Sequence, residues 1–87
     1  MKINEIKNLI RKDVPIYYRR LYSGTLVFEF LGGTSESNID FTLETKPTGM
    51  SEVIINNMDT VDYPLIPLTR EIKNFITALD VSGGLPV

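Results

Sequence analysis

The chain contains no histidine, no cysteine and no tryptophan. Without histidine and cysteine it lacks the usual nitrogen and sulfur ligands of zinc, any Ser-His-Asp or Cys-His catalytic pair, and an imidazole base for neutral pH. Catalysis would have to use carboxylates, lysine, arginine or tyrosine, and the sequence contains no recognisable constellation of these. We therefore predict a protein that is not an enzyme and that requires no cofactor and no metal.

The absence of cysteine also excludes disulfides and thiol chemistry. No apolar run reaches the roughly 18 residues that a membrane-spanning helix needs, and the first residues lack the apolar segment of a signal peptide. We expect a soluble, cytoplasmic protein on these grounds. A chain of 87 residues suffices for one hydrophobic core, so residues 1–87 are predicted to form a single small domain.

Three runs of the chain predict strands of an antiparallel sheet, at about 25–31, 38–44 and 51–56. The middle run is the clearest because apolar and polar residues alternate along it, which is typical of a strand with one buried face. Its apolar positions are Ile39, Phe41 and Leu43. The first and third runs are apolar on both faces, so we expect their second face to be covered in part by a neighbouring segment or by another molecule.

Two segments have the spacing of amphipathic helices. Apolar residues recur every three or four positions in 3–12, namely at Ile3, Ile6, Leu9 and Ile10. The same periodicity runs longer in 67–80, through Leu68, Ile72, Phe75, Ile76 and Leu79, and Gly83-Gly84 follows as an end signal. The predicted fold is an α+β two-layer sandwich, with the helices 3–12 and 67–80 on one face of a three-stranded antiparallel sheet.

Residues 14–23 are ambiguous. Asp13 is a plausible helix cap, Pro15 fits a first helical turn and Gly24 fits a helix end, which together favour one or two helical turns. Alternating apolar residues in the same stretch favour a strand, although an arginine interrupts that face. We favour the helical turns and keep the strand as the alternative.

The predicted order of helix, three strands and helix is similar to that of the double-stranded RNA-binding domain. That family grips phosphates with a lysine cluster at the start of its last helix. The corresponding stretch here, Pro67 to Lys73, has no such cluster and lies in a net acidic part of the chain. The similarity is one of topology alone, and we do not assign the family on it.

Charge is distributed unevenly along the chain. Residues 1–23 carry six basic and two acidic residues, a net charge of +4, whereas residues 24–87 carry three basic and nine acidic residues, a net charge of −6. The basic part interleaves arginine with tyrosine, two residue types that anchor protein interfaces and that can also contact phosphates and stack on bases. The candidate partner-binding residues are Arg11, Lys12, Tyr17, Tyr18, Arg19, Arg20 and Tyr22.

From this segment we predict a small non-enzymatic protein-binding or regulatory module that acts by surface complementarity, with another protein as its partner. The alternative is a nucleic-acid-binding protein that uses the same segment together with Lys7. A purely structural role is also open, in which the tyrosines pack under the sheet and the arginines pair with its acids. No membrane partner is expected. Self-association through the doubly apolar runs, giving a homodimer, is compatible with either binding function.

Overall fold

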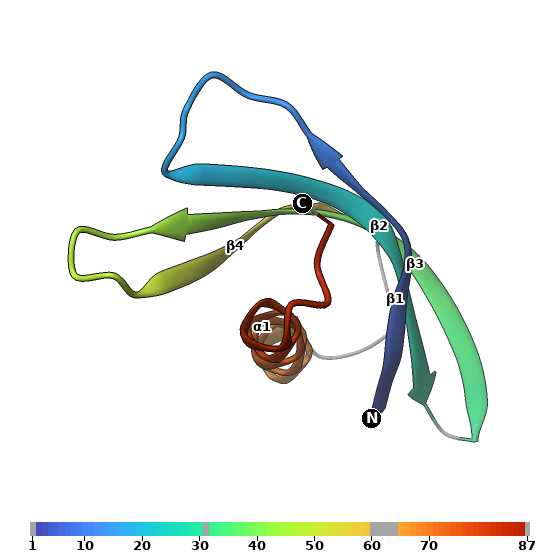
Figure 1. The fold of residues 1–87 in the computed structure, drawn as a ribbon. Helices are drawn as coiled ribbons and strands as arrows, with labels where there is room; N and C mark the ends of the chain where they lie inside the picture. The colour runs from blue at the N-terminus through green and yellow to red at the C-terminus, as the bar shows by residue number, and fades with distance from the viewer. Residues whose placement is uncertain (1, 31, 60–64, 87) are drawn as a thin grey trace.

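A four-stranded antiparallel sheet curves around one helix in the computed structural model, which describes residues 2–30, 32–59 and 65–86 (Figure 1). Each strand pairs with the next in sequence, so the spatial order is β1-β2-β3-β4. The elements are β1 (Lys2–Lys12), β2 (Arg19–Phe30), β3 (Gly33–Thr45), β4 (Ser51–Met58) and α1 (Leu65–Ser82). The helix lies in the concavity of the sheet and leaves the opposite face uncovered.

The core lies between the concave face of the sheet and the apolar stripe of α1. The sheet contributes the buried side chains of Ile6, Tyr22, Leu26, Phe28, Ile39, Phe41, Leu43 and Val53. The helix contributes Leu68, Ile72 and Ile76, none of which is exposed to solvent. Two predictions are confirmed here: the alternation in 38–44 faces the core with its apolar side, and a helix packs on that side.

The predicted N-terminal helix over 3–12 is wrong, because this segment is the edge strand β1. The register against β2 shifts between Ile3 and Glu5 and again between Lys7 and Ile10, so each irregularity inserts one extra residue. Same-face positions in a strand recur every two residues, and each bulge lengthens that interval to three. Ile3, Ile6 and Leu9 therefore reach the covered face with the spacing of a helix, and this spacing explains the error.

The predicted three-stranded sheet is also wrong. Strand β2 begins at Arg19, so the favoured helical turns over 14–23 do not form and the strand alternative holds from Arg19 onward. The run predicted as 25–31 is the second half of this longer strand, with Leu31 outside the described residues. Without an N-terminal helix, the similarity in element order to the double-stranded RNA-binding domain disappears as well.

Gly24 lies inside β2 rather than in a turn, and close packing against β1 explains its presence. A Cβ atom at this position would lie 2.9 Å from Cγ2 of Ile6, 3.1 Å from the backbone oxygen of Lys7 and 3.2 Å from Cδ2 of Leu9. The second bulge of β1 sits beside it, with Asn8 at a φ of 56°. Asparagine tolerates this left-handed conformation better than most residues, and the bulge directs two apolar side chains over the glycine.

Among the described residues, no helix is both long enough and apolar enough to span a bilayer.

Candidate functional site

The three tyrosines of the predicted binding segment occupy different environments. Tyr17 lies at the tip of the β1–β2 connection with 97% of its surface exposed, and Tyr18 beside it is 43% exposed. Their rings meet edge to face, with centroids 5.8 Å apart. Tyr22, four positions after Tyr18, is only 1% exposed. The segment is thus divided between the surface and the core, and Tyr22 is unavailable to a partner in the folded chain.

Tyr22 is part of the packing that holds the end of the chain. Its ring stacks on Phe41 with centroids 5.3 Å apart, and its hydroxyl donates a hydrogen bond of 3.3 Å to the backbone oxygen of Pro86. Leu85 is buried next to this contact. These contacts fix the tail that follows α1 on the covered face of the sheet.

Arg20 also has a structural role. Its Nη1 donates a hydrogen bond of 3.0 Å to Oδ1 of Asp80, and both side chains are about three-quarters buried. This hydrogen bond raises the pKa of the Arg20 guanidinium above its ordinary value. The pair connects β2 to the last turn of α1 and balances a carboxylate that the helix C-terminus disfavours.

The other basic residues of the N-terminal quarter are largely paired with acids of β3 across the uncovered face. The ion pairs are Lys7–Glu36 at 3.0 Å, Lys12–Asp40 at 3.6 Å and Arg19–Glu44 at 3.5 Å. The exposed Arg11 makes no ion pair with any residue in the described ranges. The positive charge of the segment is therefore neutralised locally and does not form a continuous basic patch.

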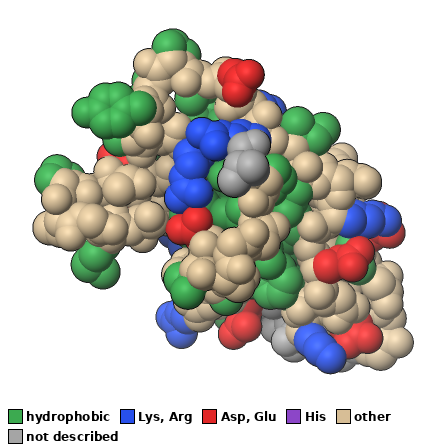
Figure 2. All heavy atoms as spheres, in the orientation of Figure 1, with side chains coloured by type: hydrophobic (Ala, Val, Ile, Leu, Met, Phe, Trp, Pro, Cys, Tyr) green, Lys and Arg blue, Asp and Glu red, His purple; other side chains and the backbone are tan. Residues whose placement is uncertain are grey.

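The exposed tyrosines belong to a surface formed by two neighbouring hairpin connections. The backbone N–H of Thr45 donates to the carbonyl of Tyr18 at 2.8 Å, which holds the start of the β3–β4 connection against the end of the β1–β2 connection. A hollow of about 640 Å³ lies between them. Figure 2 shows hydrophobic side chains at the projecting ends of the molecule where Figure 1 places the two connections. We define the hairpin-tip surface as Ile16, Tyr17, Tyr18, Glu44, Thr45, Lys46 and Pro47.

Sequence reasoning identified the tyrosines of this surface but missed its second half. Lys46 and Pro47 were recognisable only as part of a turn after the middle strand. Their position beside Tyr18 follows from the pairing of β2 with β3, in which Arg19 lies opposite Glu44. That pairing joins residues about 25 positions apart, so local patterns in the sequence carry no signal for it.

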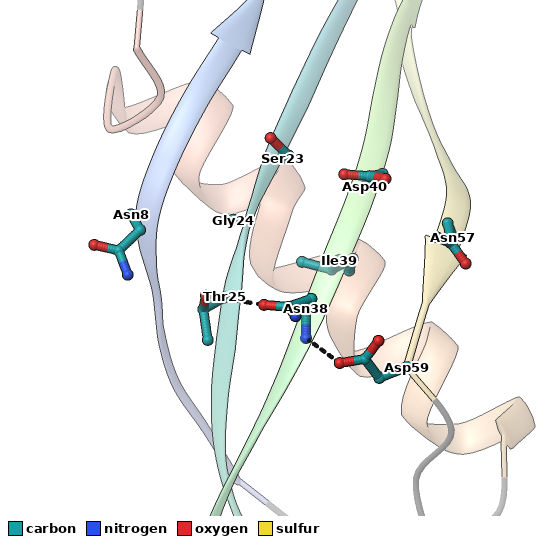
Figure 3. Close-up of a pocket in the computed structure, with 9 residues that line it drawn as sticks. All are labelled: Asn8, Ser23, Gly24, Thr25, Asn38, Ile39, Asp40, Asn57 and Asp59. Carbon is teal, nitrogen blue, oxygen red and sulfur yellow. Dashed lines mark hydrogen bonds between the residues drawn. The ribbon is translucent and has the colours of Figure 1, made fainter.

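A second hollow, of about 300 Å³, lies on the uncovered face of the sheet and is polar (Figure 3). The polar residues that line it come from all four strands and the end of β4: Asn8, Ser23, Thr25, Asn38, Asp40, Asn57 and Asp59. Several of these groups bond to one another, since Thr25 contacts the Asn38 side chain at 3.4 Å and Asp59 accepts from the Asn38 backbone at 3.1 Å. Two carboxylates in the lining make this hollow unsuitable for phosphate.

No cluster of three or more metal-ligating side chains occurs among residues 2–30, 32–59 and 65–86.

The fold and its exposed surface define a small α+β module in which an antiparallel meander is covered on one face by a C-terminal helix. The chain belongs to the BB_0187 family, whose model matches residues 1–81. This range includes all four strands and α1 up to its last residue but one. No curated protein and no solved structure matches the chain.

Proposed function

We propose that this member of the family is a non-enzymatic, cytoplasmic protein-binding module that contacts its partner through the hairpin-tip surface. The observation that carries the proposal is the run Ile16-Tyr17-Tyr18, which is exposed on a turn beside a hollow of about 640 Å³. Single exposed apolar residues are common on protein surfaces, but three in succession next to a concave surface favour a contact site.

The chemistry of the hairpin-tip surface suits a protein partner. Tyrosine offers a large apolar ring with a polar hydroxyl at low cost in conformational entropy, and it is enriched among interface hot spots. The charged groups around the rings are already paired, Arg19 with Glu44 and Lys46 with Glu52. A partner can therefore bury the rings without leaving an unpaired charge next to them, which would be costly.

Nucleic acid is the less favoured partner. Affinity for phosphates depends on basic side chains that are available to replace counterions. Lys7, Lys12 and Arg19 would each have to exchange an acid of β3 for a phosphate, and those acids would then stand close to the bound strand. The binding experiment below separates this alternative from the protein partner.

The test is affinity capture from a lysate of the native source with wild-type protein and with a Tyr17→Ala/Tyr18→Ala variant, each with and without nuclease. We expect a discrete protein that wild type captures with or without nuclease and that the double variant loses. With the purified partner, the dissociation constant should rise at least tenfold, which corresponds to about 1.4 kcal/mol. The matched control is Val81→Ala, because Val81 is 85% exposed on α1, outside the hairpin-tip surface.

Three results would count against the proposal. Capture that survives the double variant would place the contact elsewhere on the molecule. Capture abolished by nuclease, with an affinity that falls steeply between about 50 and 200 mM salt, would indicate nucleic acid. A double variant with a lowered melting temperature would show that these rings stabilise the fold, contrary to their exposure.

A further inference from the structure

The two edges of the sheet differ in how they are protected against pairing with another strand. β1 carries Lys2, Lys7 and Lys12 along its length and is interrupted by two bulges. Lysines and bulges are common protections of a free edge. β4 is regular from Ser51 to Ile55, contains no proline, and its one irregularity comes after Ile55. Glu52 is the one acidic residue in this regular stretch, and it is neutralised by Lys46 at 2.9 Å.

The hairpin geometry fixes which backbone groups of β4 face outward. Lys46 donates its N–H to the carbonyl of Met50, so this pair is hydrogen-bonded across the hairpin. Hydrogen-bonded and non-bonded pairs alternate along an antiparallel ladder. Glu52 and Ile54 therefore direct their backbone groups toward β3. The N–H and C=O groups that point away from the sheet belong to Ser51, Val53 and Ile55.

We infer that β4 pairs with β4 of a second copy of this chain, antiparallel and about a two-fold axis at Val53, to form one continuous eight-stranded sheet. In this register Val53 lies opposite Val53 of the second copy, and Ser51 lies opposite Ile55. Each of the three residue pairs can exchange two N–H···O bonds, which makes six bonds and satisfies every outward-facing group of this stretch. A two-fold axis at Ile54 would form hydrogen-bonded pairs only between Val53 and Ile55 within the stretch.

The side chains next to the edge fit the same arrangement. A hollow of about 430 Å³ lies between β4 and α1, lined by Met50, Ser51, Val53, Lys73 and Thr77 among others. Because Ile55 of the second copy lies opposite Ser51, its side chain falls at this hollow. Val53, 5% exposed, meets its symmetry mate on the same face, so the apolar core continues from one copy into the other.

The difference between the edges also explains why assembly would stop at two copies. Pairing of β4 with β1 of another copy would leave free edges at both ends and could continue into a fibre. The lysines and bulges of β1 oppose that contact. Pairing of β4 with β4 uses both unprotected edges and leaves only the two protected β1 edges outside. This interface is separate from the hairpin-tip surface, so each proposal can fail without the other.

The test compares the molar mass of wild type, Ser51→Pro and Ser51→Ala by sedimentation equilibrium over a range of concentrations. The N–H of Ser51 faces outward, so proline removes an interface donor without removing a ladder bond within the chain. We expect wild type and Ser51→Ala to rise with concentration from 9.8 kDa to twice that mass. Ser51→Pro should associate at least tenfold more weakly. A wild type that stays monomeric, or a dimer that Ser51→Pro leaves intact, would overturn the inference.

Amide hydrogen exchange on wild-type protein tests the register and does not depend on the folding of any variant. The N–H groups of Ser51, Val53 and Ile55 should become protected as the protein concentration rises, whereas those of Glu52 and Ile54 should be protected throughout. Uniform protection at all concentrations would contradict the assigned orientation. Protection of the three outward amides only after addition of a captured partner would show that another chain occupies this edge, and the inference would then be wrong.

Discussion

Replacing Gly24 by alanine tests the packing between β1 and β2 at a single atom. The new Cβ would lie 2.9 Å from Cγ2 of Ile6 and 3.1 Å from the backbone oxygen of Lys7, both closer than carbon contacts normally come. The backbone oxygen belongs to a strand paired with β2 and cannot move independently, so we expect an overpacking cost of about 1–3 kcal/mol. Alanine also restricts the unfolded chain, which returns about 0.4–1 kcal/mol.

The net loss for Gly24→Ala is therefore about 1–2 kcal/mol, a fall in melting temperature of about 4–16 °C for a domain of this size. Urea unfolding followed by circular dichroism measures it, with an unchanged dependence on urea as evidence of an intact native state. Gly84→Ala is the matched control, since its Cβ would lie 3.0 Å from the flexible Cδ2 of Leu79 and should cost much less. A Gly24→Ala protein as stable as wild type would refute the packing argument.

Three further predictions concern contacts described above. Tyr22→Phe removes the hydroxyl that holds the C-terminal tail and should lower the free energy of unfolding by about 0.5–1.5 kcal/mol in urea titrations, whereas Tyr22→Ala should cost about 3–5 kcal/mol; equal losses would contradict the buried ring. Asp80→Asn weakens the bond to Arg20 and should cost about 0.5–1 kcal/mol, less than a lone ion pair suggests because the helix C-terminus favours the neutral side chain; a stabilised variant would show that the bond contributes nothing. Hydrogen bonding to Lys46 lowers the pKa of Glu52, so this carboxylate adds stability above its unfolded pKa and loses it as pH falls through its folded pKa; Lys46→Ala should return the pKa of Glu52 toward its ordinary value in a carboxyl-carbon NMR titration, and an unchanged titration would exclude the pair in solution.

The parts of the fold that the sequence predicts correctly are those where one periodicity runs without interruption. The residues from Ile39 to Leu43 keep a strict period of two, and Leu68, Ile72 and Ile76 keep a helical period, and both sets are buried as expected. β1 fails because two bulges convert a period of two into apparent helical spacing. Local spacing cannot separate a bulged strand from a short amphipathic helix, because both place every third or fourth residue on one face.

The candidate surface was only partly predictable for a different reason. Exposure of Tyr17 and burial of Tyr22 depend on where β2 begins and on which face each position takes, and both follow from pairing with β3. The contribution of Lys46 and Pro47 depends on the same long-range pairing. The residue types indicated a contact region, while the division between core and surface required the fold.

The position of α1 at the end of the chain has a consequence for protein synthesis. The sheet is complete in sequence by Met58, and its concave face contains Leu26 and Phe41, neither of which is exposed in the folded protein. The helix that covers this face is made last, from Leu65 onward. Synthesis of those final residues, roughly 20 at about 5–20 residues per second, takes about 1–4 s. During that interval the nascent chain presents a bare apolar sheet, so its solubility in the cell depends on how fast the ribosome finishes the helix.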